Sequence, residues 1–283
     1  MSETLATLQS LFTIAFVVSS MLVMGVSLTV GQIIEPLRNV RLVLLALLAS
    51  FVVVPGTAYL LKQVIPMNEQ LQIGLILMSC AHGAPFLPKV SQIAKGNLAF
   101  AVGLMSLLIV ATVIYLPLVL PLLLPGVSID AGQIALSLFG LMLVPLAIGL
   151  VVRWRWEEAA AEIKGPLAQV SNVSLVLLLV LMLGLNIENV IALFGSGALL
   201  AVLILTVVAA VVGYLFGGPR RDTRGVLALG TALPNMAATF VVADGSFADQ
   251  PDVIVFLAGA GLIVLLIVFP LAAELGKRPS AAP

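Results

Sequence analysis

Two short stretches that interrupt apolar segments hold the residues best suited to contact a solute. The first runs from Ser79 to Lys89 and contains the single histidine, His82, and the second runs from Gly230 to Asn235. A histidine within an apolar segment can bind a solute or exchange a proton near neutral pH. An asparagine there offers an amide donor and a carbonyl acceptor, and it is costly to bury without partners.

Prolines and a glycine in these stretches predict that the helices break there. Pro85, Pro88 and Pro234 lack a backbone N–H, and Gly83 tolerates conformations that other residues avoid. Within a membrane, the freed backbone groups are costly unless protein or a cavity covers them. Two such breaks, one in each half of a membrane chain, are typical of the binding site of a transporter. We expect two broken helices of opposite direction to meet mid-membrane and form a pocket.

The polar and wall-forming residues of both breaks make up the predicted substrate site. They are His82, Gly83, Ala84, Pro85, Phe86, Thr231, Pro234 and Asn235. Two roles stay open at this point. The His82 ring could contact substrate or a proton, or it could only satisfy freed backbone carbonyls. Lys89 could pair with an anionic substrate, or it could extend to the lipid headgroups.

The composition predicts an all-α integral membrane protein. Of 283 residues, 61% are hydrophobic and 9% are charged, and the mean hydropathy is +1.23. A soluble chain of this length could not cover so much apolar surface. The net charge of +0 and the single Cys80 point to no nucleic-acid partner, no internal disulfide and no multi-cysteine metal site. The expected partners are a small molecule and membrane lipid, without a protein partner or metal centre.

Nine apolar segments are each about long enough to cross a bilayer, which takes about 20 residues. They are 8–30, 40–62, 70–94, 98–124, 131–152, 167–187, 192–216, 223–244 and 251–275. Segments 70–94 and 223–244 contain the two breaks. The polar connection from Arg153 to Pro166 is predicted to be a loop, and the whole chain is predicted to form a single domain.

Basic residues predict the orientation of these segments in a cell or inner membrane. Every Lys and Arg except Lys62 falls in connections on one side of the predicted topology. By the positive-inside rule, that side is cytoplasmic, so the N-terminus is outside and the C-terminus is inside. The acidic N-terminus lacks the basic region of a signal peptide, so we expect the first segment to be retained. Trp154 and Trp156 are typical of interfacial anchors.

The two halves show a weak internal repeat. In each, a broken segment is followed by a glycine-containing apolar segment with a late proline, Gly103 to Pro117 in one half and Gly261 to Pro270 in the other. The two broken segments run in opposite directions, so the repeat is inverted. Inverted repeats are a common basis of alternating access.

These stretches resemble the bile acid:sodium symporter family. The resemblance rests on Ala81–Pro88, on the Ala94–Asn97 turn and on Gly230–Asn235, and Ser50–Pro55 is similar to the family's span before the first break. It covers nearly the whole chain. The resemblance implies that the two broken helices cross at the substrate site. Family members carry bile acids or smaller organic anions, usually with sodium.

The resemblance also implies two groups of helices that move against each other. The panel domain would contain 8–30, 131–152 and 167–187. The core domain would contain 40–62, 70–94, 98–124, 192–216, 223–244 and 251–275.

The sequence departs from the family pattern where sodium binds. Phe86 and Leu87 replace a Ser-Asn pair, Gly230 and Pro234 replace a glutamate and a glutamine, and Ser50 replaces another glutamine. Sodium needs hard oxygen ligands, preferably including a carboxylate. The residues left as candidates for ion coupling are His82, Ser50, Ser106, Thr231 and Asn235. Sodium is the coupling ion that the family implies, and a proton or no coupling ion is the alternative.

These observations predict a secondary transporter of a small organic anion, either bile-acid-like or a short-chain carboxylate, that works by alternating access. A channel is a less favoured alternative. An intramembrane enzyme would need a nucleophile and a base, for which only Ser79 beside His82 is suited, so we expect no enzymatic activity.

Overall fold

The computed structural model describes residues 3–34, 38–124, 130–185, 188, 191 and 193–277, and the regular structure of this part of the chain is helical. In chain order the helices are α1 (Glu3–Ser27), α2 (Val30–Ile34), α3 (Val40–Leu48), α4 (Val54–Val64), α5 (Glu69–Cys80), α6 (Leu87–Ile93), α7 (Leu98–Leu123), α8 (Ala131–Leu138), α9 (Val144–Arg155), α10 (Glu157–Leu185), α12 (Ala198–Phe216), α13 (Arg221–Ala232), α14 (Met236–Ser246) and α15 (Pro251–Lys277).

Six helical segments of the described chain are long and apolar enough to cross a membrane. They are Thr7–Ser27, Val40–Val64, Leu98–Leu123, Ala131–Arg155, Ala198–Phe216 and Pro251–Lys277. Each coincides with a predicted segment. Of the other three predictions, 70–94 and 223–244 are each divided into two shorter helices, and 167–187 begins within α10. The length and apolar character of these helices agree with the predicted class, an all-helical integral membrane protein.

Both predicted breaks are present. The first separates α5 from α6 over residues 81–86, and the second separates α13 from α14 over residues 233–235. The second break is shorter than predicted, because Gly230 and Thr231 still belong to the last turn of α13. Pro234 explains the boundary, since it cannot donate the backbone hydrogen bond that would continue the helix.

Two predicted boundaries are wrong. The connection from Arg153 to Pro166 is not a loop, because α9 ends at Arg155 and α10 begins at Glu157. Its alanines and glutamates favour helix, and Arg153 pairs with Glu157 at 2.7 Å across the turn. The segment predicted from residue 192 is interrupted by a turn over residues 194–197, where Gly197 adopts a left-handed conformation with a φ of 74°, and its long helix begins at Ala198.

Two of the long helices contain a π-helical turn just before a proline. These turns span Ala49–Val53, before Pro55, and Phe139–Leu143, before Pro145. A proline removes one backbone donor, and an added residue in the turn relieves its clash with the preceding turn. Four residues before Pro55, the carbonyl of Phe51 accepts a hydrogen bond of 2.6 Å from the Tyr115 hydroxyl of α7.

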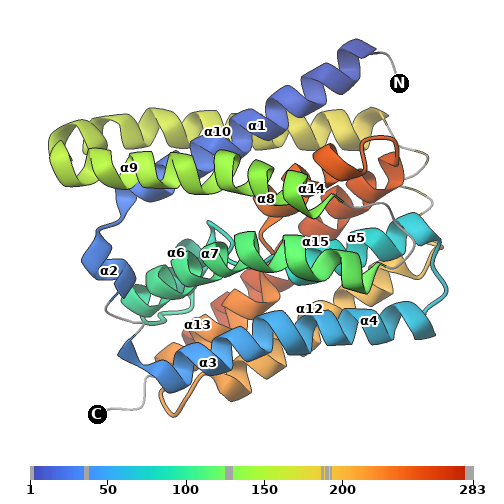
Figure 1. The fold of residues 1–283 in the computed structure, drawn as a ribbon. Coiled ribbons are helices and arrows are strands. Elements are labelled where there is room, and N and C mark those ends of the chain that lie inside the picture. Colours follow the sequence, from blue (N-terminus) through green and yellow to red (C-terminus); the bar gives the residue numbers. More distant parts are fainter. Residues whose placement is uncertain are drawn as a thin grey trace.

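The helices form two groups that lie one above the other (Figure 1). Helices α1, α9 and α10 run side by side at the top of the view, and α3, α4 and α12 lie at the bottom. Gly25 and Gly149 let α1 and α9 approach closely, since a Cβ on Gly149 would lie 2.7 Å from the Leu22 carbonyl oxygen. Ser20 and Ser171 join α1 to α10 at 2.6 Å. The upper group contains the predicted panel segments, and its movement against the rest stays a prediction.

Candidate functional site

The two breaks lie directly against each other. The Asn235 backbone N–H donates to the Ala81 carbonyl at 2.8 Å, and His82 and Pro234 form an isolated antiparallel bridge. Each break therefore supplies backbone partners that the other has lost. The predicted contact between the two breaks is confirmed, and its place at the middle of a membrane stays a prediction.

Asn235 holds this crossing together through its side chain. Its Nδ2 donates to the carbonyls of Gly83 at 3.2 Å and His82 at 3.4 Å. Its Oδ1 accepts from the Ala238 N–H at 3.1 Å and so caps α14. The residue is 0% exposed. Both polar ends of Asn235 thus support the crossing, and a contact to substrate or ion stays a prediction.

Thr112 of α7 hydrogen-bonds both backbone polar groups of His82, a role that the sequence analysis missed. Its Oγ1 accepts from the His82 N–H and donates to the His82 carbonyl, both at 2.9 Å. Figure 1 shows α7 crossing the middle of the molecule beside these half-helices. A lone threonine in the middle of an apolar helix is the only signal that could have indicated this role.

The His82 side chain is enclosed, at 1% exposure. Its ring packs edge-on against Phe51, with centroids 5.4 Å apart. Its Nδ1 has no hydrogen-bond partner within the described part of the chain. Together with the hydroxyls of Ser79, Thr206 and Thr231, the ring lines a space of about 10 Å³. This space is about the size of one water molecule.

The other polar candidates are less closely associated. The Thr231 hydroxyl donates to the Ala209 carbonyl at 2.7 Å, which joins α13 to α12. The Ser106 hydroxyl donates to Val102 on its own helix at 3.0 Å. The Ser50 hydroxyl is fully buried in a π-helical turn and has no partner among the residues described. The structure thus brings His82, Thr231 and Asn235 together, whereas Ser50 and Ser106 share no hydrogen bond with them among the described residues.

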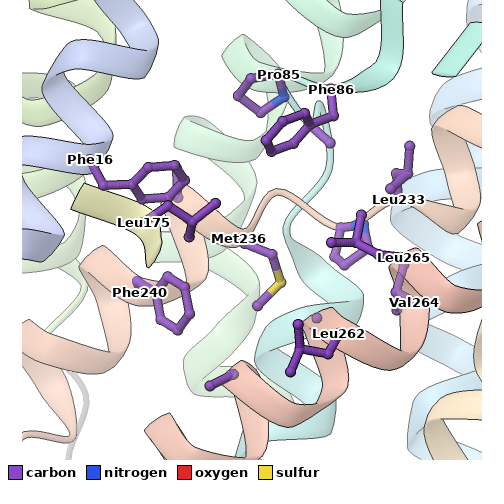
Figure 2. A pocket seen from close by; sticks show the side chains of 15 residues that line it. Phe16, Pro85, Phe86, Leu175, Leu233, Met236, Phe240, Leu262, Val264 and Leu265 are labelled. Atoms are coloured by element: carbon purple, nitrogen blue, oxygen red, sulfur yellow. The ribbon is translucent and has the colours of Figure 1, made fainter. Parts of the chain in front are cut away.

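An apolar pocket of about 60 Å³ lies beside the crossing (Figure 2). Four predicted site residues line it, namely Ala84, Pro85, Phe86 and Pro234. Phe16 of α1 and Leu175 of α10 close it from the upper group of helices. Met236 and Phe240 of α14 form another part of its wall. Sequence reasoning missed these walls, because a pocket-lining apolar residue in a membrane helix looks like any other.

A larger cavity of about 660 Å³ lies between α1 and α10 on one side and α6 and α7 on the other. Pro85 and Phe86 line both this cavity and the apolar pocket. Its charged lining residues are Lys89 and Lys164, and no carboxylate of the described chain lines it. Its polar lining residues are Ser20, Ser27, Gln32, Gln92 and Asn172. Of the two roles considered for Lys89, its position in this cavity favours a contact with an anion.

The opposite end of α1 is bound to the broken helix α14. The Ser10 hydroxyl donates to the Asp244 carboxylate at 3.1 Å, and the two helices pack against each other there. Lys89 and Lys164 line the cavity beside the other end of α1, together with Ser27 and Leu28. The two groups of helices therefore separate around a cavity at one end and are joined at the other.

Comparison with known proteins shows which family the chain is similar to. The model of the Sodium Bile acid symporter family matches residues 14–193. The chain is 26% identical over 195 residues to the probable sodium/metabolite cotransporter BASS2 of Oryza sativa, which covers 69% of this chain and 46% of that protein. It is 25% identical over 199 residues to the uncharacterized sodium-dependent transporter YocS of Bacillus subtilis, covering 69% and 59%.

A third relative is the probable sodium/metabolite cotransporter BASS3 of Arabidopsis thaliana, 25% identical over 197 residues, with 69% of this chain and 46% of that protein covered. The matches span about half the length of these curated relatives. The family model covers more than half of the chain, including the first break. The chain therefore belongs to the sodium bile acid symporter family, whose members are transporters and not enzymes.

Proposed function

We propose that this protein is a secondary transporter that carries an organic anion across the membrane. The observation that carries the proposal is the cavity of about 660 Å³ that ends at Pro85 and Phe86 and is lined by Lys89 and Lys164. Its volume falls in the range of about 300–1,000 Å³ that is usual for small-molecule sites. Two lysines without a lining carboxylate favour a negatively charged solute.

The size of the apolar pocket favours a small anion at the crossing itself. About 60 Å³ is room for several water molecules, or for a short alkyl group. A short-chain carboxylate could place its apolar end between Phe86 and Met236 and keep its charge toward the lysines. A bile-acid-like solute would have to lie mainly in the larger cavity.

The proposed topology has nine membrane crossings in an inverted repeat, with the N-terminus outside and the C-terminus in the cytoplasm. Helices α5 with α6 and α13 with α14 would each make one crossing, interrupted at its centre. The exposed Trp154 and Trp156, at 81% and 55%, flank the α9–α10 turn as residues at a membrane interface do. Lys89 and Lys164 would then lie on the cytoplasmic side.

Transport is proposed to proceed by alternating access, with α1, α8, α9 and α10 moving against the remaining helices. The cavity separates these two groups at the proposed cytoplasmic end, whereas Ser10 and Asp244 join them at the other. This is the arrangement of a carrier that faces inward. A carrier closed at one end at a time is favoured over a channel, which needs a continuous path.

Removing the charge of the lysines tests the proposed anion site. Lys89→Gln and Lys164→Gln are each expected to raise the KM for uptake of an organic anion about fivefold in proteoliposomes, because a partly exposed charge pair contributes up to about 1 kcal/mol. The substrate is chosen first by a thermal-shift screen of organic acids on purified protein. Lys95→Gln is the matched control, since it removes the same charge six residues from Lys89 and outside the cavity. Equal KM values for all three variants would contradict the anion site.

The residues at the crossing fit a sodium site poorly. Three hydroxyls and an imidazole line the small space around His82, and no carboxylate is among them. Among the described residues, no group of three or more His, Cys, Asp or Glu side chains is placed to hold a metal ion. Without a carboxylate, neutral oxygens offset less of the cost of removing sodium from water. We therefore propose that sodium is not required for transport.

Separate gradients test the coupling ion. Uptake into proteoliposomes is expected to continue when sodium is replaced by potassium on both sides. If an inward proton gradient accelerates uptake, His82→Gln is expected to remove that acceleration, because His82 is the only histidine and lies at the crossing. Uptake that stops without sodium would refute this part of the proposal. A proton-driven rate that survives in His82→Gln would exclude His82 as the proton carrier.

A further inference from the structure

A fourth cavity lies away from the crossing and shares no lining residue with the three described above. It has a volume of about 420 Å³ and is enclosed by the start of α3, the end of α12 and the loop into α13. These elements lie together at the lower left of Figure 1, on the side of the molecule opposite α1 and α10. In the topology proposed above, this end faces the cytoplasmic leaflet.

Three arginines line this cavity. Arg41 makes no hydrogen bond or ion pair with any residue that the structure describes. Arg220 pairs with Asp222, with its Nη2 at 2.6 Å and its Nε at 3.1 Å from the two carboxylate oxygens. Arg224 donates from Nε to the Gly218 carbonyl at 2.6 Å, which leaves its terminal nitrogens free of that bond. Asp222 offsets one of the three charges, so the cavity keeps an excess of positive charge.

The loop from α12 to α13 holds two of these arginines in place. Gly217 lies so close to the backbone of Arg224 that a Cβ would overlap it, and Gly218 has a φ of 80°. The Thr223 hydroxyl donates to the Gly217 carbonyl at 2.6 Å, and the Arg224 guanidinium lies 5.6 Å from the centre of the Tyr214 ring. The basic wall is thus formed by the fold before any ligand arrives, which lowers the cost of binding.

Apolar side chains continue from this cavity along the surface of the helices. Leu42, Leu45, Leu215 and Phe216 form its apolar walls. Exposed apolar residues recur every four positions along α3 and along α12, and these are Val40, Leu44, Leu48, Val207, Val211 and Leu215. In a membrane, these exposed rows face acyl chains. A ligand that suits both the basic cavity and the apolar rows carries a phosphate at one end and hydrocarbon at the other.

We propose that this cavity binds an anionic glycerophospholipid of the cytoplasmic leaflet. Its phosphate would lie against Arg41 and Arg224, where guanidinium groups can donate two hydrogen bonds to phosphate oxygens. Its acyl chains would follow the exposed rows of α3 and α12. Basic pockets between membrane helices at the cytoplasmic side recognise anionic headgroups in this way. A soluble phosphate compound shares the headgroup chemistry but not the acyl chains.

Native mass spectrometry of the full chain in detergent, titrated with phosphatidylglycerol, tests this site. Arg41→Gln is expected to weaken binding of this lipid about fivefold, and Arg41→Glu about 25-fold, since one basic residue near a membrane surface contributes about a factor of five. Arg41 is the residue of choice because none of the described residues depends on it. Arg38→Gln and Arg38→Glu are matched controls that change the same charge nearby but outside the cavity. The controls are expected to bind the lipid like the unchanged protein.

Two further titrations identify the source of the phosphate. Phosphatidylcholine is expected to bind more weakly than phosphatidylglycerol and to lose less affinity in Arg41→Glu, because its choline cation offsets the charge of its phosphate. Inorganic phosphate at millimolar concentration is expected to leave phosphatidylglycerol binding unchanged. Displacement of the lipid by inorganic phosphate would instead assign the cavity to a soluble phosphate compound and overturn the proposal. Equal losses in the Arg38 and Arg41 variants would also overturn it, because the effect would then reflect general surface charge.

Discussion

Gly83→Ala is expected to lower the free energy of unfolding by about 3–5 kcal/mol and to abolish transport. Gly83 has a φ of 89°, where a residue with a Cβ is strained by about 1–2 kcal/mol. A Cβ there would lie 2.6 Å from the backbone nitrogen of Ile109 and 2.9 Å from the Met105 carbonyl oxygen. Because both are backbone atoms of α7, no side chain can move aside, and α7 itself would have to shift. Detergent-induced unfolding and uptake assays measure the two effects.

Gly56→Ala is the matched control for this change. Gly56 lies in α4, and a Cβ on it would meet nothing within 4 Å. The alanine is expected to leave stability unchanged or to raise it by up to about 1 kcal/mol, since it favours helix more than glycine does. If Gly83→Ala were as stable as Gly56→Ala, the close packing of the first break on α7 would be wrong.

Asn235→Ala is expected to cost about 2–4 kcal/mol of unfolding free energy and to stop transport. The change removes the cap of α14, worth about 1 kcal/mol. It also leaves the buried Gly83 carbonyl without the Asn235 amide donor, at about 1–3 kcal/mol for a buried polar group that loses its partner, whereas the His82 carbonyl keeps its bond from the Thr112 hydroxyl. Since the amide bridges residues 152 positions apart, its loss should loosen the crossing itself.

Asn68→Ala separates the two contributions to the Asn235 effect. Asn68 caps α5 through a 2.9 Å bond to the Leu71 N–H, but it is exposed and lies outside the crossing. Its replacement should cost only the cap, about 1 kcal/mol, and preserve uptake. A similar cost for both variants would show that the bonds from Asn235 to the first break do not stabilise the protein. Asn235→Asp should also be destabilised, because a carboxylate cannot donate to the Gly83 carbonyl.

Gly83→Ala and Asn235→Ala both disturb the crossing of the two breaks. Gly83 allows the first break to lie against α7, and Asn235 ties that break to the second one. A rigid crossing gives a substrate site a fixed geometry while the surrounding helices move. This agrees with the proposal that α5, α6, α13 and α14 stay in one group while α1, α8, α9 and α10 move against it.

The sequence alone determined the membrane class, six of the long apolar helices and the approximate position of both breaks. Apolar segments of about 20 residues dictate membrane helices whatever their neighbours. Pro85 and Pro234 interrupt helices through their own missing N–H groups, so these effects are also local. The same local reasoning failed between Arg153 and Pro166, where polarity was taken to mean a loop although Glu157 and the following alanines favour helix.

Only the tertiary structure decided what each polar residue contacts. Asn235, predicted to contact substrate, uses its amide to brace the first break. Thr112 and Lys164 did not stand out in the sequence, yet one satisfies the backbone of His82 and the other lines the large cavity. The physical reason is that a buried polar group must find a partner wherever the fold supplies one, and here the partners lie on helices far apart in the chain.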